Sequence, residues 1–216
     1  MPSTRTLLAR GPWELDQVRT RWHETAYSPS PEERAAADVA IAELRGRGSP
    51  SHDGLSARLI DYRAEDGGIE IELQPARWAL RLVPGNACES VAALCLIRSA
   101  DGQWLAGRRA AWLSSWAGRW ALGAGGAVEV GENPATTLVR EAREEWSVDP
   151  VRVRAEALVS LPHKLVMFVG MAWLADDACV VPDHEHDAFA WWPADVSQWP
   201  PEADDALRRM GKLLSG

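Results

Sequence analysis

The most constraining feature of this sequence is a short segment that carries three glutamates at helical spacing. Asn133 is a good N-cap and Pro134 is tolerated at the first helical position, so we expect a helix to begin here. At about 100° per residue, Glu141, Glu144 and Glu145 fall within an arc of about 100°. The adjacent face is apolar, so the segment predicts an amphipathic helix with an acidic stripe beside its buried side.

Taken alone, the acidic stripe indicates either a metal site or a solvated helix face. Like charges one helical turn apart cost about a few tenths of a kcal/mol. A hard divalent cation makes the clustering of these charges favourable instead of costly, because carboxylate oxygens suit Mg²⁺ or Mn²⁺. Mg²⁺ completes its shell with water and substrate phosphates, which suits metal-assisted attack of water on a phosphate. For an isolated E-x-x-E-E pattern, the solvated face would be the better explanation.

The longer pattern favours the metal site. A glycine is followed after five residues by glutamate, after seven more by Arg-Glu, and two residues later by Glu-Glu. These positions are Gly126, Glu132, Arg140, Glu141, Glu144 and Glu145. The pattern closely resembles the Nudix box of the Nudix hydrolase family, and so many fixed positions rarely coincide by chance.

The resemblance implies roles for these residues. Glu141, Glu144 and Glu145 would hold Mg²⁺ or Mn²⁺, and one of them would help to activate water. Arg140 would act at the site by pairing with Glu132, which fixes the preceding loop against the helix, and Gly126 would be structural. The backbone carbonyl of Gly125 would be a further metal ligand.

One position departs from the box. Ser147 stands where the family has a glycine after the helix. A glycine at this position suits a left-handed C-terminal cap. Serine there would cost about 1 kcal/mol of backbone strain, or the helix would end differently.

Two residues outside the box are further candidates. Glu185 precedes an aromatic-rich segment and is a candidate for an extra metal ligand or a general base. Arg109 ends an expected strand and is a candidate for binding a substrate phosphate, or else a plain surface arginine. Several of the twelve tryptophans must be core residues, and one or two that line a cleft could stack a nucleobase.

The resemblance covers roughly residues 88–200 and implies an α/β fold, a Nudix-type α/β/α sandwich with a mixed sheet. It implies a metal-dependent hydrolase that cleaves a diphosphate linkage in a nucleoside diphosphate derivative, such as a nucleotide sugar or ADP-ribose. The alternatives are a catalytically inactive Nudix-fold regulator that binds a nucleotide, and an enzyme that removes damaged nucleoside triphosphates.

Composition limits the kinds of binding partner and the cellular location that we expect. The 216 residues allow one large or two small domains, and the net charge of −8 argues against a nucleic-acid partner. We expect no membrane span and no signal peptide, and we expect three reduced thiols, hence a cytoplasmic protein. The expected partner is a small-molecule nucleotide, with a homodimer as an open possibility.

We place a domain boundary after the segment Pro84–Asn86. Residues 1–86 would form a small α+β extension that acts as a lid, selects substrate, mediates dimerisation or only supports the second domain. Residues 87–216 would form the Nudix domain. Apolar periodicity predicts helices over 13–27, from Pro31 and over 201–214, and strands over 55–63, 69–73, 90–97, 103–109, 151–161 and 165–174.

Overall fold

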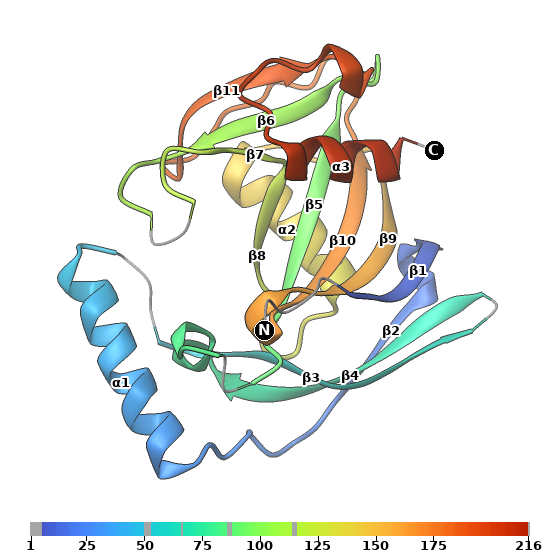
Figure 1. Ribbon diagram of the computed structural model, residues 1–216. Coiled ribbons are helices and arrows are strands. Elements are labelled where there is room, and N and C mark those ends of the chain that lie inside the picture. Colours follow the sequence, from blue (N-terminus) through green and yellow to red (C-terminus); the bar gives the residue numbers. More distant parts are fainter. Residues whose placement is uncertain (1–5, 50–52, 66, 86–87, 114–115, 216) are drawn as a thin grey trace. The chain divides into compact units, whose positions relative to one another are not determined.

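The computed structural model describes the chain except for residues 1–5, 50–52, 66, 86–87, 114–115 and 216 (Figure 1). The described residues form three α-helices: α1 (Pro31–Gly46), α2 (Pro134–Trp146) and α3 (Asp205–Leu214). They also form eleven β-strands: β1 (Thr6–Glu14), β2 (Val18–Trp22), β3 (Leu55–Glu65), β4 (Gly68–Arg77), β5 (Val91–Arg98), β6 (Trp104–Arg109), β7 (Trp120–Leu122), β8 (Ala124–Ala127), β9 (Arg152–Ser160), β10 (Val166–Trp173) and β11 (His186–Trp192). This content confirms the predicted α/β fold.

The strands of the described residues belong to two sheets. Hydrogen bonding orders the larger sheet as β1-β9-β10-β5-β6-β11, with β7 paired to β6 and β8 paired to β5. The smaller sheet has the order β2-β4-β3, and it is mixed because β2 runs parallel and β3 antiparallel to β4. None of the helices in the described ranges has the length and apolar character needed to cross a lipid bilayer.

The chain divides into two compact units, each built from three separate segments. The first unit comprises Met1–Leu94, Gly126–Thr137 and Arg154–Gly170, and the second comprises Cys95–Gly125, Leu138–Val153 and Met171–Gly216. The boundary expected from the sequence, between residues 86 and 87, lies outside the described residues. The first unit contains residues from both sides of that boundary.

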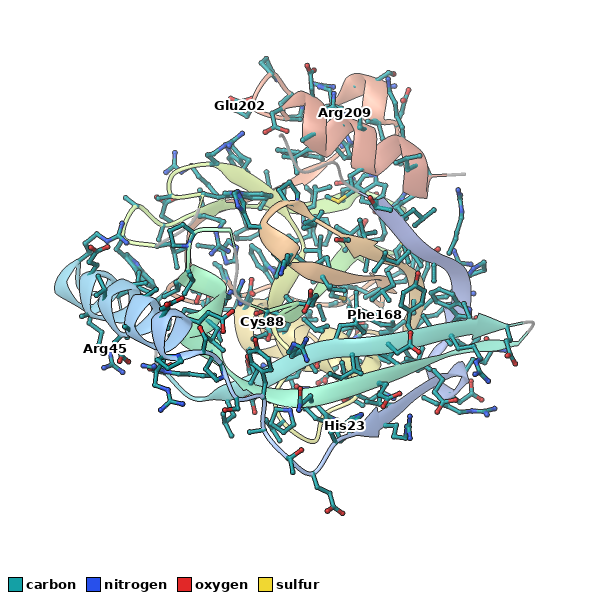
Figure 2. The ribbon with its side chains drawn as sticks, turned by 60° about the horizontal axis from the view of Figure 1, so that its bottom comes forward. His23, Arg45, Cys88, Phe168, Glu202 and Arg209 are labelled. Atoms are coloured by element: carbon teal, nitrogen blue, oxygen red, sulfur yellow. The ribbon has the colours of Figure 1, made fainter. Side chains whose placement is uncertain are left out.

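In the first unit, α1 begins as its sequence predicts. The Ser30 hydroxyl accepts a hydrogen bond from the Glu33 N–H, and the Glu33 carboxylate accepts one from the Ser30 N–H. This capping box satisfies backbone donors that would otherwise lack partners. The apolar side of α1 then packs against the end of β4 and the segment after it, in a cluster of Ala37, Ile41, Leu44, Ala76, Ala79, Leu80 and Cys88. Figure 2 labels Cys88 and Phe168, which are both buried in this unit.

The helix predicted over 13–27 is wrong. The segment instead contains the end of β1, a short 3-10 turn and β2. Val18 is buried while Arg19 and Arg21 are exposed, which is the alternation of a strand. Parallel pairing of β2 with β4 supplies the backbone hydrogen bonds, so tertiary pairing overrides the helical spacing of a few apolar residues.

In the second unit, strand β6 ends at Arg109 and strand β11 begins at His186. β11 pairs antiparallel with β6, and the register sets His186 opposite Arg109. Tryptophans supply much of the core: Trp199 lies 5.6 Å from Trp104 and 5.2 Å from Trp192 between ring centroids. Helix α3 approaches Trp199 closely because Gly211 has no side chain; a Cβ there would lie 2.5 Å from the indole.

The last helix of the second unit differs from expectation at its start. Helix α3 begins at Asp205 rather than at 201, and its Leu213 is 67% exposed. Of the two cysteines in this unit, Cys95 is buried and Cys179 is exposed.

Ser147 does adopt the left-handed conformation. Its φ is 55°, and its N–H donates to the Arg143 carbonyl at 3.0 Å, as in a left-handed helix cap. The strain expected from the sequence is therefore present at this position.

Replacing Ser147 with glycine is expected to raise the melting temperature by about 1–4 °C, because relief of left-handed strain is worth about 0.5–1 kcal/mol. Differential scanning fluorimetry on the full chain would measure the shift. Ser147→Ala keeps the strain and serves as the control, with no rise expected. A lower melting temperature for the glycine variant would show that the serine side chain makes a contact worth more than the strain.

Candidate active site

The entrance to helix α2 is built within the first unit. Asn133 caps the helix, since its side-chain oxygen accepts a hydrogen bond from the Ala135 N–H at 2.9 Å. The Glu132 carboxylate accepts from the Glu129 N–H at 3.0 Å and from the Thr137 hydroxyl at 2.8 Å. Glu132 thus ties the loop that follows Gly126 in β8 to the first turn of the helix. The expected pair between Arg140 and Glu132 stays a prediction.

Strand β2 also holds this entrance. The Asn133 side-chain amide donates to the Val18 carbonyl at 2.7 Å, and the Trp22 indole donates to the Glu132 carbonyl at 2.8 Å. Residues of the amino-terminal region therefore fix the backbone on which the acidic helix begins.

The three glutamates of the box lie in different environments. Glu141 and Glu145 are 6% and 5% exposed, whereas the Glu144 side chain is 58% exposed. Arg140 lies beside two of them: its Nη1 is 2.7 Å from Glu141 Oε1 and 2.8 Å from Glu144 Oε2. The guanidinium thus partly neutralises two of the three carboxylates.

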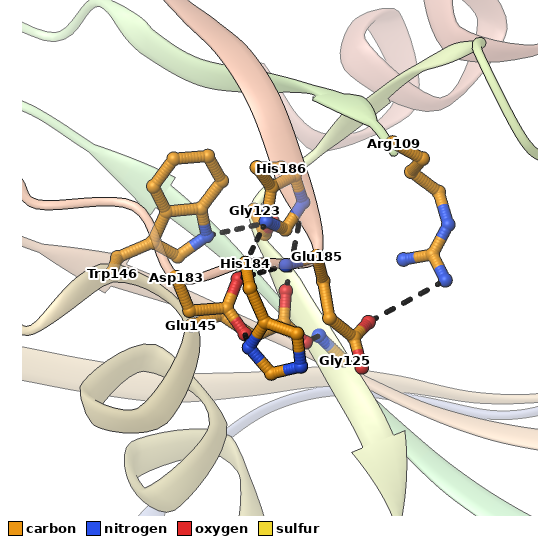
Figure 3. Close-up of polar contacts among 9 residues, drawn as sticks. All are labelled: Arg109, Gly123, Gly125, Glu145, Trp146, Asp183, His184, Glu185 and His186. Carbon is orange, nitrogen blue, oxygen red and sulfur yellow. Dashed lines mark hydrogen bonds and ion pairs between the residues drawn. The ribbon is translucent and has the colours of Figure 1, made fainter. Parts of the chain in front are cut away.

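Glu145 is held by the backbone before the box. Its Oε1 accepts a hydrogen bond from the Gly125 N–H at 2.8 Å, and the neighbouring Trp146 indole donates to the Gly123 carbonyl at 3.0 Å (Figure 3). Gly125 is therefore next to the acidic helix, as the sequence implied, although the contact recorded uses its N–H. The role of its carbonyl stays a prediction.

The register between β6 and β11 brings the other two candidates together. Arg109 Nη2 lies 3.7 Å from Glu185 Oε2 (Figure 3). The Ala110 N–H donates to the Glu185 carbonyl at 2.7 Å. The Arg109 side chain is 18% exposed, so it is not a plain surface arginine. Glu185 also influences the acidic helix electrostatically, because its charge raises the pKa of Glu141 and Glu145.

Burial dominates the electrostatics of these carboxylates. It raises the pKa of Glu141 to about 7; the Arg140 charge opposes this rise, and Glu144 and Glu185 add to it. Burial also raises the pKa of Glu145 well above its usual range, against the Gly125 hydrogen bond and with help from Glu141. The pKa of Glu185 is raised by burial and lowered by Arg109. A positive charge that arrives beside such carboxylates lowers their pKa again and favours the ionised form.

Two residues that the sequence analysis did not select lie in this network. The His186 Nδ1 is 3.3 Å from Asp183 Oδ1, and its Nε2 is 3.7 Å from Glu145 Oε2. Burial lowers the pKa of His186, although Asp183 opposes the shift. The only sequence signal was the run Asp-His-Glu-His-Asp before an aromatic strand, and a two-histidine spacing alone is poor evidence of a site.

An exposed pair of rings flanks Glu185. The Trp112 indole and the His184 imidazole are nearly parallel, with 5.4 Å between centroids and 7° between planes. Trp112 is 36% exposed and the His184 side chain is 73% exposed. Such an arrangement presents an exposed aromatic surface beside the segment that carries Glu185.

The donor chemistry fits a hard divalent cation. Within the described parts of the chain, no three acidic, histidine or cysteine side chains are gathered as a ready-made metal site. The helix nevertheless offers two buried carboxylates whose charged forms are disfavoured, and only oxygen ligands of the type that Mg²⁺ prefers. A dication would relieve that cost and would compete with Arg140 for Glu141 and Glu144.

Comparison with solved structures finds limited similarity. The chain is 24% identical to a Deinococcus radiodurans protein over 47% of this chain and 65% of that one, with a TM-score of 0.41. It is 22% identical to an Ap4A hydrolase of C. elegans over 57% of this chain and 92% of that one, with a TM-score of 0.45. It is 20% identical to the NUDIX domain of Shewanella oneidensis NrtR, solved with ADP ribose, over 57% and 86% of the two chains, also with a TM-score of 0.45.

A family model gives the stronger result. No curated protein matches the chain. The model described as the NUDIX domain matches residues 89–213, which is more than half of the 216 residues and includes the acidic helix, Arg109 and Glu185. The resemblance stated from the sequence is confirmed, and the chain belongs to the NUDIX domain family of hydrolases.

Proposed function

We propose that this protein is a metal-dependent hydrolase that cleaves the diphosphate linkage of a nucleoside diphosphate derivative. The observation that carries the proposal is the pair of buried carboxylates, Glu141 and Glu145, on one side of α2. Burying two carboxylates without a cation costs free energy. A divalent cation that binds beside Glu141 and Glu145 would remove much of that cost. A diphosphate brings further oxygen ligands for the same ion.

Glu141, Glu144 and Glu145 would hold Mg²⁺ or Mn²⁺. When bound, the ion supplies Lewis-acid stabilisation of charge on the phosphate and lowers the pKa of bound water. Arg109 binds a phosphate oxygen of the substrate, and Glu185 acts as a further ligand or accepts the proton of the attacking water. A raised pKa suits that second role, because an efficient general base has a pKa near the working pH.

The alternative is a regulator that binds a nucleotide without cleaving it. Arg140 favours this alternative, because its guanidinium already lies between Glu141 and Glu144. The two functions differ in turnover. The discriminating assay incubates the protein with nucleoside diphosphate sugars, ADP-ribose, dinucleoside polyphosphates and nucleoside triphosphates, with Mg²⁺ or with EDTA. Metal-dependent release of phosphate esters supports the hydrolase, and binding without product supports the regulator.

The exposed rings beside Glu185 favour a substrate with a base. Replacing Trp112 with alanine is expected to raise KM for a nucleotide substrate about 5- to 50-fold with little change in kcat, since stacking one base contributes about 1–3 kcal/mol. Trp112→Phe retains an aromatic face and should lose much less. The same variants assayed on ribose 5-diphosphate, which has no base, should match the wild type. An equal loss on both substrates would argue against base stacking.

The division of the chain into an extension over 1–86 and a Nudix domain over 87–216 is likewise our proposal. The start of the family match at residue 89 supports it. The contacts of Val18 and Trp22 with the box give the extension a structural role, which is to hold the entrance of the acidic helix.

A further inference from the structure

The last turn of helix α2 and the segment before β11 are joined twice. The Asp183 N–H donates to the Glu145 backbone carbonyl at 2.8 Å. From the Asp183 carboxylate the path continues to His186 Nδ1 at 3.3 Å, and from His186 Nε2 to Glu145 Oε2 at 3.7 Å. The path leaves Glu145 at its backbone and returns to its side chain, so these three residues form a closed loop of contacts (Figure 3).

The imidazole in this loop has little freedom to turn. The His186 side chain is 1% exposed, and its ring lies 4.3 Å from the Trp146 ring, tilted by 33°. Gly107 on β6 provides the space, since a Cβ there would lie 2.4 Å from His186 Cδ2. Asp183 is fixed as well, because its Oδ1 also accepts a hydrogen bond from the Glu185 N–H at 2.9 Å.

The consequence falls on the Glu145 carboxylate. Its Oε1 is bound by the Gly125 N–H at 2.8 Å, and its Oε2 faces the immobile imidazole at 3.7 Å. The second distance is too long for a hydrogen bond, so His186 restrains this oxygen by contact and by its dipole. With one oxygen bonded and the other confined, the plane of the carboxylate is set before any ligand arrives.

We propose that His186, supported by Asp183, is a positioning residue that orients Glu145 for binding a divalent cation. The inference rests on the proposed metal-dependent function. Residues behind metal ligands typically change metal affinity 10- to 100-fold when they are replaced. His186 contacts Glu145 and Asp183 and acts on the cation only through Glu145.

Two isosteric replacements of His186 separate the role of its Nε2 from that of its Nδ1. In His186→Gln the side-chain amide nitrogen falls near the place of Nε2 and keeps a polar group against Glu145. In His186→Asn it falls near Nδ1 and keeps only the contact with Asp183. Binding of Mn²⁺ to the full chain without substrate, measured by loss of the free-ion EPR signal, should be within about threefold of wild type for glutamine. It should be at least about tenfold weaker for asparagine.

Stability and control variants make the result decisive. Melting temperatures are recorded for each protein, and Asp183→Ala serves as a second variant at a partly exposed position, with at least threefold weaker Mn²⁺ binding expected. His163→Asn, at an exposed histidine, is the matched control and should bind like wild type.

Unchanged affinity in His186→Asn and Asp183→Ala, or equal losses in the glutamine and asparagine variants, would overturn the positioning role. Absence of Mn²⁺ binding in the wild type would instead remove the metal function itself, and the inference with it.

Discussion

Replacing Glu145 with glutamine is expected to lower kcat with Mg²⁺ by more than about 100-fold while the protein stays folded. Glutamine retains an oxygen that can accept the Gly125 hydrogen bond, which is 2.8 Å long in the native protein. It cannot supply the negative charge that a dication needs. Steady-state product release on the best substrate of the panel, with Mg²⁺ varied, would measure the loss.

The same variant should be more stable than the wild type when metal is absent. Burial raises the pKa of Glu145 well above its usual range, so its ionised form destabilises the fold at alkaline pH. At pH 8 in EDTA, Glu145→Gln should therefore melt at a higher temperature. Glu202→Gln, at an exposed glutamate of the same unit, is the matched control and should change neither rate nor stability. Turnover near the wild-type rate would refute a metal-binding role for Glu145.

Much of the site could be predicted because its signals are local. A helix that begins at Asn133 and carries glutamates at fixed spacing needs no knowledge of the rest of the chain, and α2 forms over Pro134–Trp146. The left-handed Ser147 follows from the same local pattern. The burial of Glu141 and Glu145 beside an exposed Glu144 was not foreseen, since it depends on what packs against the helix.

The unpredicted part of the site depends on strand register. His186 faces Glu145 because β11 pairs with β6 so that His186 lies opposite Arg109, and because Gly107 leaves room for the ring. Neither condition can be derived from the short run of charged residues around His186. The error over residues 13–27 has the same origin, because the partner strand of β2 lies some fifty residues later in the chain. Local patterns identified the chemistry, whereas long-range pairing selected the residues that support it.

In the absence of divalent metal, the protein is expected to lose stability through Glu141 as the pH rises from about 5 to 8. Burial raises its folded-state pKa to about 7 from the ordinary value of 4.5. Between these values the folded state binds more protons than the unfolded state, so the free energy of unfolding falls as pH increases. A shift of this size corresponds to at most about 3 kcal/mol. His186 acts in the opposite direction, because its folded-state pKa is lowered.

A comparison of variants isolates the contribution of Glu141. Chemical denaturation of wild type and Glu141→Gln in EDTA, at intervals between pH 5 and 8, should give a difference in unfolding free energy that grows with pH in favour of glutamine. The His186 contribution is common to both proteins and cancels. Added Mg²⁺ should stabilise the wild type more at pH 8 than at pH 5 and should have much less effect on the variant, because only the ionised carboxylate is a strong ligand. If the difference in unfolding free energy did not change with pH and Mg²⁺ had no effect, Glu141 would be neither a buried acid with a raised pKa nor a metal ligand.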